Sequence, residues 1–272
     1  MPELPEVETV RRGIEPHVLG RCIADVLVRD ARLRWPVDPK LAQRLRGRRI
    51  EAASRRGKYL LLHLDNGDRL IIHLGMSGSV LVLKPGHPTK KHDHVDLLLS
   101  GKILLRFHDP RRFGAVLLWP EAQATHPLLE NMGPEPFSKE FNGDYLYQRA
   151  RGRTAAVKNF VMDGRIVVGA GNIYAAEALF RSGIRPAKAA GRLSRAQCTA
   201  LVEKIREVLS EAIKKGGTTL RNFAGADGSP GYFRQKLFVY GRAGEPCLVC
   251  GTAIRRAIIG QRSSFHCPKC QT

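Results

Sequence analysis

The spacing of apolar and polar residues changes along the chain and divides its 272 residues into a β-rich part and a helical part. Between Cys22 and Trp119, short apolar runs alternate with turn pairs such as Asn66-Gly67 and Ser100-Gly101, a pattern typical of antiparallel strands. The expected strands cover 23–28, 59–64, 69–74, 80–83, 95–99, 102–107 and 115–118. Many short strands without intervening helices predict an antiparallel β-sandwich.

A short helix is expected before this sheet region, over Pro5 to Ile14. Apolar residues recur there at helical spacing, and the acidic residues Glu3 and Glu6 lie in the first turn, where the helix dipole favours anions. The hexapeptide at the start of the chain therefore has an ordinary explanation as a helix start. The same residues would also place two carboxylates beside the terminal amine.

Helical patterns return after the stretch 126–142, which is rich in Pro and Gly and reads as an interdomain linker. One helix is expected from a cap at Asn172 to a stop at Gly183. A second begins with a capping box of Ser194 and Gln197 and ends at the pair 216–217, before a polar, Gly-rich loop over 218–231. The pattern predicts an α+β multidomain chain. The expected domains are a β-sandwich over 1–132, a helical domain over 133–237 and a small module over 238–272.

The chain is strongly basic, and this charge indicates its partner. It has 45 Lys and Arg against 25 Asp and Glu, which gives a net charge of +20. A field of that sign attracts a polyanion, and nucleic acid is the leading candidate. No apolar run approaches the roughly 20 residues that span a bilayer, and the start lacks the regions of a signal peptide. We therefore expect a cytoplasmic protein with no membrane partner.

Four of the six cysteines lie near the end of the chain in two C-x-x-C pairs. The pairs are Cys247 with Cys250 and Cys267 with Cys270, and 16 residues separate them. This spacing is typical of one tetrahedral Zn²⁺ site, and four thiolates leave no open position for water. We expect a structural zinc ion there. Cys22 and Cys198 read as ordinary thiols.

Removal of Met1 would make Pro2 a secondary amine at the start of the chain. An α-amino group titrates at about 7.7–8.0, well below a lysine, so a useful fraction is unprotonated near neutral pH. Such an amine attacks carbonyl carbons and forms Schiff bases.

Several other segments have both a structural and a nucleic-acid interpretation. Lys58 fits a solvated rim or a phosphate contact, and Met76, between Gly75 and Gly78, fits either a core position or a wedge between bases. Arg111 and Phe113 offer a cation and a stacking plane, although a turn with a packed Phe is equally consistent.

Two segments of the second half also suit phosphate binding. The run 169–174 is too short for a dinucleotide fingerprint, but glycines before a helix can hold one phosphate with the help of Asn172. Between the cysteine pairs, a predicted hairpin with Gly260 at its middle presents Gln261 and Arg262, which suits either a phosphate contact or a solvated turn.

Five separated segments together resemble bacterial formamidopyrimidine-DNA glycosylases, which remove oxidised purines. The segments are Pro2 to Glu6, Lys58, His73 to Gly78 with Asp109 to Gly114, Gly169 to Tyr174, and the four-cysteine tail introduced by Val239 to Arg242. The resemblance implies a β-sandwich with an N-terminal helix, a helix-two-turns-helix domain, a zinc-finger hairpin, and a monomer that binds double-stranded DNA. It also implies removal of 8-oxoguanine and formamidopyrimidines, followed by β,δ-elimination at the abasic site.

By position, the resemblance implies a role for each residue. Pro2 would be the nucleophile at sugar C1′, Glu3 would move protons at the sugar, and Glu6 would support the lesion pocket. Lys58 and Arg262 would complete the catalytic set through the phosphates at the lesion. Met76, Arg111 and Phe113 would fill the gap left by the extruded nucleotide. Backbone phosphates would be bound by His73, Lys158 and Asn172.

Two alternatives remain at this point. One is an endonuclease VIII-type glycosylase for oxidised pyrimidines, although Leu4, Met76 and Phe113 match the purine type. The other is a non-catalytic zinc protein that binds damaged DNA, which would not need Glu3, Glu6 and Lys58 together.

Overall fold

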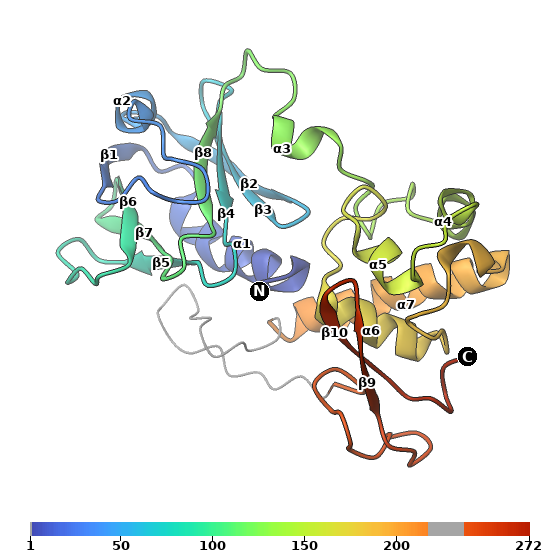
Figure 1. The fold of residues 1–272 in the computed structure, drawn as a ribbon. Coiled ribbons are helices and arrows are strands. Elements are labelled where there is room, and N and C mark those ends of the chain that lie inside the picture. Colours follow the sequence, from blue (N-terminus) through green and yellow to red (C-terminus); the bar gives the residue numbers. More distant parts are fainter. Residues whose placement is uncertain (1, 217–236) are drawn as a thin grey trace. The chain divides into compact units, whose positions relative to one another are not determined.

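The computed structural model of the protein describes residues 2–216 and 237–272 (Figure 1). The described residues form two compact units, one of 2–130 with Gly216 and the other of 131–215 with 237–272. Each unit has its own apolar core. None of the helices among the described residues combines the length and the hydropathy that a bilayer-spanning segment requires.

The first unit is an antiparallel β-sandwich, as the sequence predicts. One sheet has the order β1-β6-β7-β5 and the other the order β2-β3-β4-β8. The strands of the first sheet are β1 (Ile23–Val28), β6 (Asp93–Leu99), β7 (Ile103–His108) and β5 (Ser79–Leu83). Those of the second are β2 (Ile50–Arg56), β3 (Tyr59–Leu64), β4 (Arg69–His73) and β8 (Ala115–Trp119).

The core of this unit is built from side chains of both sheets. Leu60, Leu62 and Ile72 of one sheet and Leu97 and Leu105 of the other belong to one buried apolar cluster. Burial of each such side chain contributes about 1.5–3 kcal/mol relative to exposure. The alternation of inward apolar positions in these strands therefore fixes their register.

Helix α1 (Leu4–Val18) packs on the sandwich through Val7, Val10, Ile14 and Val18. The helix is longer than the expected Pro5 to Ile14 because Pro16 lies in its last turn, where the loss of one amide donor interrupts little of the helix. The chain leaves the helix at Leu19, whose N–H still donates to Glu15 O.

The sequence pattern did not predict two elements of the first unit. Strand β2 has only Ile50 and Ala53 buried, and its charged residues hide the strand pattern. Antiparallel pairing with the apolar strand β3 holds β2 in its extended conformation. Helix α2 (Leu41–Leu45) is only five residues long.

The second unit is mostly helical. Its helices are α4 (Gly143–Ala150), α5 (Val157–Met162), α6 (Asn172–Arg181) and α7 (Arg195–Lys214), with the 3₁₀ turn η1 (Ala190–Arg192). A short helix of the first unit, α3 (Pro127–Glu130), lies inside the predicted linker. Helices α4 and α5 were not predicted, whereas the capping box of Ser194 and Gln197 at α7 is confirmed.

The predicted cap of α6 was wrong by one residue. Gly171 is the cap, with an extended backbone at φ −112° and ψ −158°, and its carbonyl accepts the first helical bond from Ala175 N–H at 3.0 Å. Asn172 is therefore the first residue inside the helix. The predicted stop is confirmed, because Gly183 follows the C-cap Ser182 with φ +67°.

The end of the chain forms the predicted hairpin, β9 (Arg255–Ile259) paired with β10 (Arg262–His266). Its two-residue turn is Gly260-Gln261, and both residues have positive φ, +55° and +60°, the conformation of a type I′ turn. The expected loop over 218–231 lies outside the described residues.

Candidate functional site

The first turn of α1 places Pro2 beside two buried carboxylates. Pro2, Glu3 and Glu6 are all buried. The Glu3 N–H donates to Glu6 Oε2 at 2.8 Å, which orients Glu6 and satisfies an amide that the helix leaves unused. Carboxylates at this end of the helix are also stabilised by its dipole. The three residues form a fixed group at the start of the chain.

Lys58 occupies the hairpin turn between β2 and β3. The last strand pair is Arg56 with Tyr59, so Gly57 and Lys58 are the two turn residues, and Gly57 has φ +56°. A glycine at the first central position is what a type II′ turn requires. The turn holds the half-buried Lys58 at the end of the sheet, next to strand β4.

Strand β4 ends at His73, whose imidazole is held neutral by its surroundings. Burial is the main cause that lowers the pKa of His73 to about 4, and the charges of Arg34 and Lys58 add to it. Its ring lies 4.8 Å from the ring of Tyr59. Gly75 N–H donates to His73 Nδ1 at 3.2 Å. The single proton of the neutral ring is therefore on Nε2, which is a donor.

Pairing of β5 with β7 brings the two predicted wedge segments together. Ser79 is opposite His108 in this pair, so the residues just before β5 lie beside those just after β7. Met76 and Phe113 are 40% and 45% exposed. The alternatives of a core methionine and a packed phenylalanine are therefore wrong.

Arg111 completes this group and defines a pocket with it. Its guanidinium carbon lies 4.7 Å from the centre of the Phe113 ring, a cation–π distance. A pocket of about 570 Å³ is lined by Arg34, His73, Gly75, Met76, Arg111, Arg112 and Phe113. We call Met76, Arg111 and Phe113 the wedge.

Gly75 is required by the close approach of the two segments. It has φ +61°, and a Cβ built on it would lie 2.4 Å from the carbonyl carbon of Phe113. Real Cβ atoms do not approach a backbone carbon so closely. Any side chain at this position would push the two halves of the wedge apart.

In the second unit, Lys158 and Asn172 both donate hydrogen bonds to strand β10 of the C-terminal hairpin. Lys158, on α5, is completely buried, and its Nζ donates to Ser263 O at 3.0 Å and to Ser264 Oγ at 2.5 Å. Asn172 Nδ2 donates to Ser263 O at 3.1 Å. The structure therefore brings these two predicted phosphate ligands to the strand that carries the exposed Arg262.

The hairpin tip also touches α5. A Cβ on Gly260 would lie 2.4 Å from the side-chain nitrogen of Asn159. At the other end of the module, the Gln271 side chain accepts from Cys267 N–H at 2.9 Å and donates to Ile184 O at 2.8 Å. The contacts with Asn159 on α5 and with Ile184 after α6 dock the tail of the chain on the rest of its unit.

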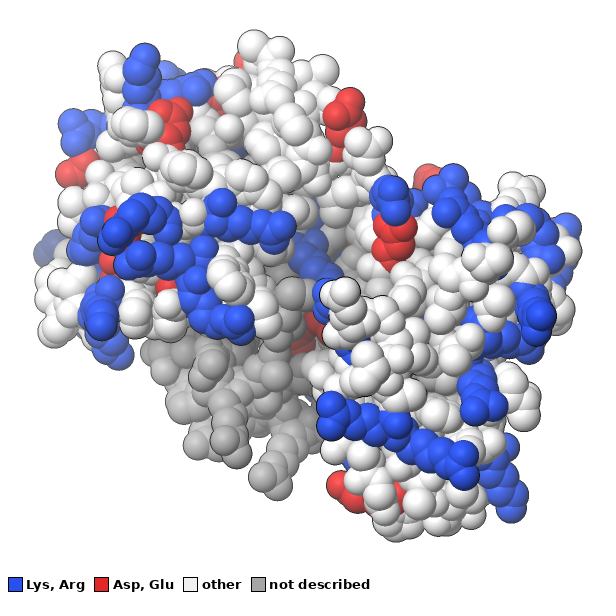
Figure 2. Space-filling view, in the orientation of Figure 1, with Lys and Arg blue, Asp and Glu red and all other residues white. Residues whose placement is uncertain are grey.

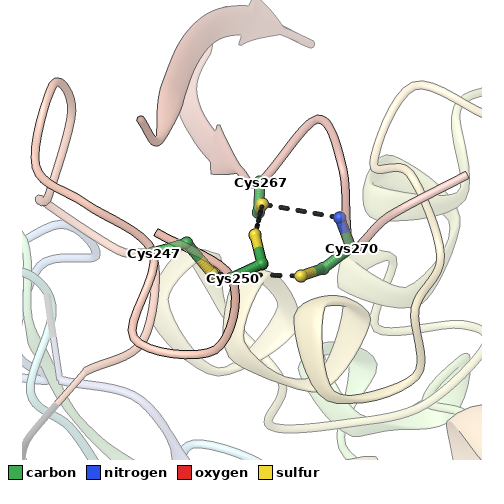
Figure 3. Close-up of side chains that lie close together, drawn as sticks. All are labelled: Cys247, Cys250, Cys267 and Cys270. Atoms are coloured by element: carbon green, nitrogen blue, oxygen red, sulfur yellow. Dashed lines mark hydrogen bonds between the residues drawn. The ribbon is translucent and has the colours of Figure 1, made fainter. Parts of the chain in front are cut away.

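The four cysteines predicted to bind zinc lie together (Figure 3). All four sulfur atoms are within 4.8 Å of one another. The separations are 3.4 Å between Cys250 and Cys267 and 3.9 Å between Cys247 and Cys270. A tetrahedron with Zn–S bonds of about 2.3 Å has edges of about 3.8 Å, so the set fits a zinc ion. Two amides already point at its sulfurs, Val249 N–H at Cys247 and Cys270 N–H at Cys267.

Basic side chains predominate over acidic ones on the visible surface of each unit (Figure 2). This distribution agrees with the net charge of +20. A surface of this sign provides the sequence-independent part of nucleic-acid binding.

Three residues that fix the C-terminal hairpin and the segment before it were not singled out from the sequence. Glu177 is buried on α6, and its carboxylate accepts the N–H groups of Phe238, Val239 and Tyr240 at 2.8–3.0 Å. It thereby fixes the segment that enters the zinc module. An acidic residue inside the apolar run of α6 was the available signal. Ser263 and Ser264 carried no signal.

Three family profiles match the chain in order. They describe the formamidopyrimidine-DNA glycosylase N-terminal domain (residues 1–116), the formamidopyrimidine-DNA glycosylase H2TH domain (132–224), and a zinc finger found in FPG and IleRS (244–272). The formamidopyrimidine-DNA glycosylase of Methylococcus capsulatus is 58% identical over 271 residues, with all of both chains covered.

Solved structures agree with this match. A mutant of Lactococcus lactis FPG in complex with DNA containing Fapy-dG has a TM-score of 0.92 at 34% identity, with all of both chains covered. A complex of Lactococcus lactis Fpg with DNA containing an abasic site has a TM-score of 0.91 at 34% identity, again with complete coverage.

Proposed function

Because this chain belongs to the formamidopyrimidine-DNA glycosylase family, we propose that it excises oxidised purines from double-stranded DNA and cleaves the resulting abasic site. The observation that carries the proposal is the fixed group of Pro2, Glu3 and Glu6 at the start of α1. The related Lactococcus complexes with Fapy-dG and with an abasic site support the two activities.

Extrusion of the damaged nucleotide is the first step. A base inside a duplex is out of reach, and its extrusion costs a few kcal/mol of stacking and pairing. The exposed side chains of Met76 and Phe113 fill the gap in the stack, and Arg111 faces the orphaned cytosine. Apolar and aromatic surface placed between bases offsets part of the cost.

Excision follows by attack of the Pro2 amine on C1′ of the extruded nucleotide. Met1 must first be removed, since only a terminal proline nitrogen has a free lone pair. The nitrogen forms a bond to C1′ as the glycosidic bond breaks, and the base leaves with a proton. Glu3 transfers protons at the sugar ring, which opens as the cationic imine forms.

The lyase step uses the same imine. The imine withdraws electrons from C2′, so a proton there is removed and the 3′ phosphate leaves by β-elimination. A second, δ-elimination expels the 5′ phosphate. Water then releases the sugar fragment and regenerates the Pro2 amine.

Phosphates around the lesion are bound by groups from several elements. Lys58 supplies a cation, and neutral His73 donates from Nε2 without the cost of a buried charge. Asn172, at the first turn of α6, adds an amide at the positive end of that helix. Arg262 contacts a phosphate directly. The buried Lys158 acts indirectly, because it holds the strand that presents Arg262.

Zinc supplies no reactive group in this scheme, because four thiolates complete its coordination. Cys247, Cys250, Cys267 and Cys270 would hold the ion, and these four thiolates would thereby fix the base of the hairpin that presents Arg262. We further propose that the protein acts as a monomer in the cytoplasm at the nucleoid, with domains over 1–132, 133–237 and 238–272.

Incision of a panel of labelled duplexes tests the proposal. We expect cleavage of duplexes with 8-oxoguanine or formamidopyrimidine opposite cytosine, and much weaker cleavage of those with oxidised pyrimidines. Borohydride added during the reaction should trap a covalent complex, and peptide mapping should place the DNA on Pro2. Preference for pyrimidine lesions, or a trap on a lysine, would overturn it.

A further inference from the structure

Asp109 connects the two segments that carry the wedge. It follows β7 and is completely buried, and its carboxylate accepts hydrogen bonds from both segments. Oδ1 accepts from the Ser77 hydroxyl at 2.6 Å, and Oδ2 accepts from Gly114 N–H at 2.8 Å. Ser77 directly follows Met76, and Gly114 directly follows Phe113. One carboxylate is therefore bonded to the immediate neighbours of two wedge residues.

Arg111, the third member of the wedge, belongs to the same network. Its backbone N–H lies 3.2 Å from Ser77 Oγ and 3.3 Å from Asp109 Oδ1. Ser77 donates to Asp109 and accepts from Arg111, so the three residues form a closed ring of hydrogen bonds. Arg111 is thus bonded to the Asp109 carboxylate itself, and Met76 and Phe113 each adjoin a residue that is.

The backbone of Asp109 is itself fixed to the sheet. Its N–H donates to His92 O at 3.0 Å, and its carbonyl oxygen lies 2.8 Å from His94 Nε2. His94 lies on β6 in the interior of the sandwich. The backbone from which the carboxylate projects is therefore anchored at β6 and at the residue before it.

A carboxylate is suited to this task by its chemistry. Hydrogen bonds to an ionised acceptor are about twice as strong as neutral ones, and two oxygens allow one side chain to bond to both segments. A buried carboxylate is also costly unless such donors satisfy it. If the two segments separated, the Asp109 carboxylate would lose its hydrogen-bond donors or become exposed to water. The network therefore favours one arrangement of the wedge.

From these contacts we infer that Asp109, acting through Ser77 and Gly114, is a positioning residue that sets the wedge before DNA arrives. It does not touch the DNA. The inference rests on the proposed function, because it concerns how the wedge is held. Side chains ordered in advance lose less entropy when they enter the stack. The network should therefore matter when a paired base must be displaced and not when the lesion is already unpaired.

Single-turnover excision from two substrates tests the inference. One is a duplex with 8-oxoguanine opposite cytosine, and the other carries the same lesion as a one-nucleotide bulge. For Ser77→Ala and Asp109→Asn we expect excision from the paired duplex to slow by about tenfold or more, the loss expected for a hydrogen bond to a charged group. Excision from the bulge should stay within about twofold of wild type. The milder Ser77→Ala keeps the test valid if Asp109→Asn folds poorly.

Asp68→Asn is the matched control. Asp68 is a buried aspartate of the same sandwich and accepts Glu121 N–H at 2.8 Å, away from the wedge. Asp68→Asn should slow excision from neither substrate. A fluorescent 2-aminopurine next to the lesion should report slower opening of the paired duplex for Ser77→Ala, but not for the control.

Equal losses on both substrates would assign Ser77 and Asp109 a general structural role and overturn the inference. Wild-type rates on both substrates would also overturn it. Failure of the proposed function looks different, because the wild-type protein would then excise the lesion from neither substrate.

Discussion

Lys158 Nζ lies 2.5 Å from Ser264 Oγ, so a buried ammonium of the helical part is bonded to the strand that presents Arg262. The same ammonium donates to Ser263 O at 3.0 Å. The position of the Arg262 guanidinium therefore depends on a lysine more than 100 residues earlier in the chain.

This bond predicts that Ser264→Ala weakens DNA binding without removing a phosphate contact. We expect an affinity loss of about threefold to tenfold, consistent with loss of one hydrogen bond to a charged donor. The slope of log K against log salt should stay at the wild-type value, whereas Arg262→Ala should reduce it by about 0.9. Fluorescence anisotropy titrations at several salt concentrations measure both. Ser263→Ala is the control, because Ser263 acts through its backbone carbonyl.

If the terminal amine of Pro2 is the nucleophile, activity should be lost when any residue precedes Pro2. A variant that retains Met1, or that carries one added residue before Pro2, should give no borohydride trap and no strand cleavage, because its proline nitrogen is an amide. DNA affinity should remain within about threefold of wild type, since charge and wedge are unchanged. Gel shift and trapping assays of the same preparation separate the two effects. Trapping by the extended variant would contradict the role of Pro2.

His73 predicts a loss of stability in acid. Its folded pKa is about 4, against 6.5 when exposed, and burial is the main cause. The unfolded chain therefore binds the proton more readily, and the stability linked to neutral His73 is complete above about pH 6.5. It is lost as pH falls from there towards 4, by about 3 kcal/mol at most.

Urea unfolding of wild type and His73→Gln at pH 7 and pH 4.5 checks this prediction. The stability of the variant should fall less over this range, because it has no imidazole to protonate. NMR titration of the His73 ring should show no protonation between pH 8 and 6. A ring that titrates near pH 6.5 would refute the assignment.

Zinc removal should disable the hairpin and leave the sandwich intact. Cys250→Ser or treatment with a strong chelator should reduce bound zinc, measured by atomic absorption, and weaken DNA binding by about tenfold or more as Arg262 loses its position. The far-UV circular dichroism spectrum of the protein should change little, because the core of the β-rich part is separate from that of the hairpin. Full DNA affinity in a zinc-free protein would exclude the hairpin from the interface.

The strands with long apolar runs were predictable because their side chains fill the core, so the apolar run in the sequence marks the strand. Strand β3 was predicted with its correct limits, 59–64. Strand β2 was not, because only two of its seven residues are buried and it forms through pairing with β3. The cap of α6 was placed one residue late, since Asn172 is a common cap type and Gly171 has no side chain to indicate its role.

The sequence by itself determined the features that lie close together along the chain. These are the proline and two acids at the start, the two cysteine pairs with zinc spacing, and the apolar periodicity. Each is local because a short stretch of backbone already fixes the distances between its residues.

Only the tertiary structure decided what lies together across long separations. Met76 and Arg111 are 35 residues apart, and the pairing of Ser79 with His108 brings their segments side by side. The same folding buries Asp109 between them and places Lys158 against Ser264. Strand register and the burial of polar groups depend on the whole core, and for this reason the pattern of a single segment does not contain them.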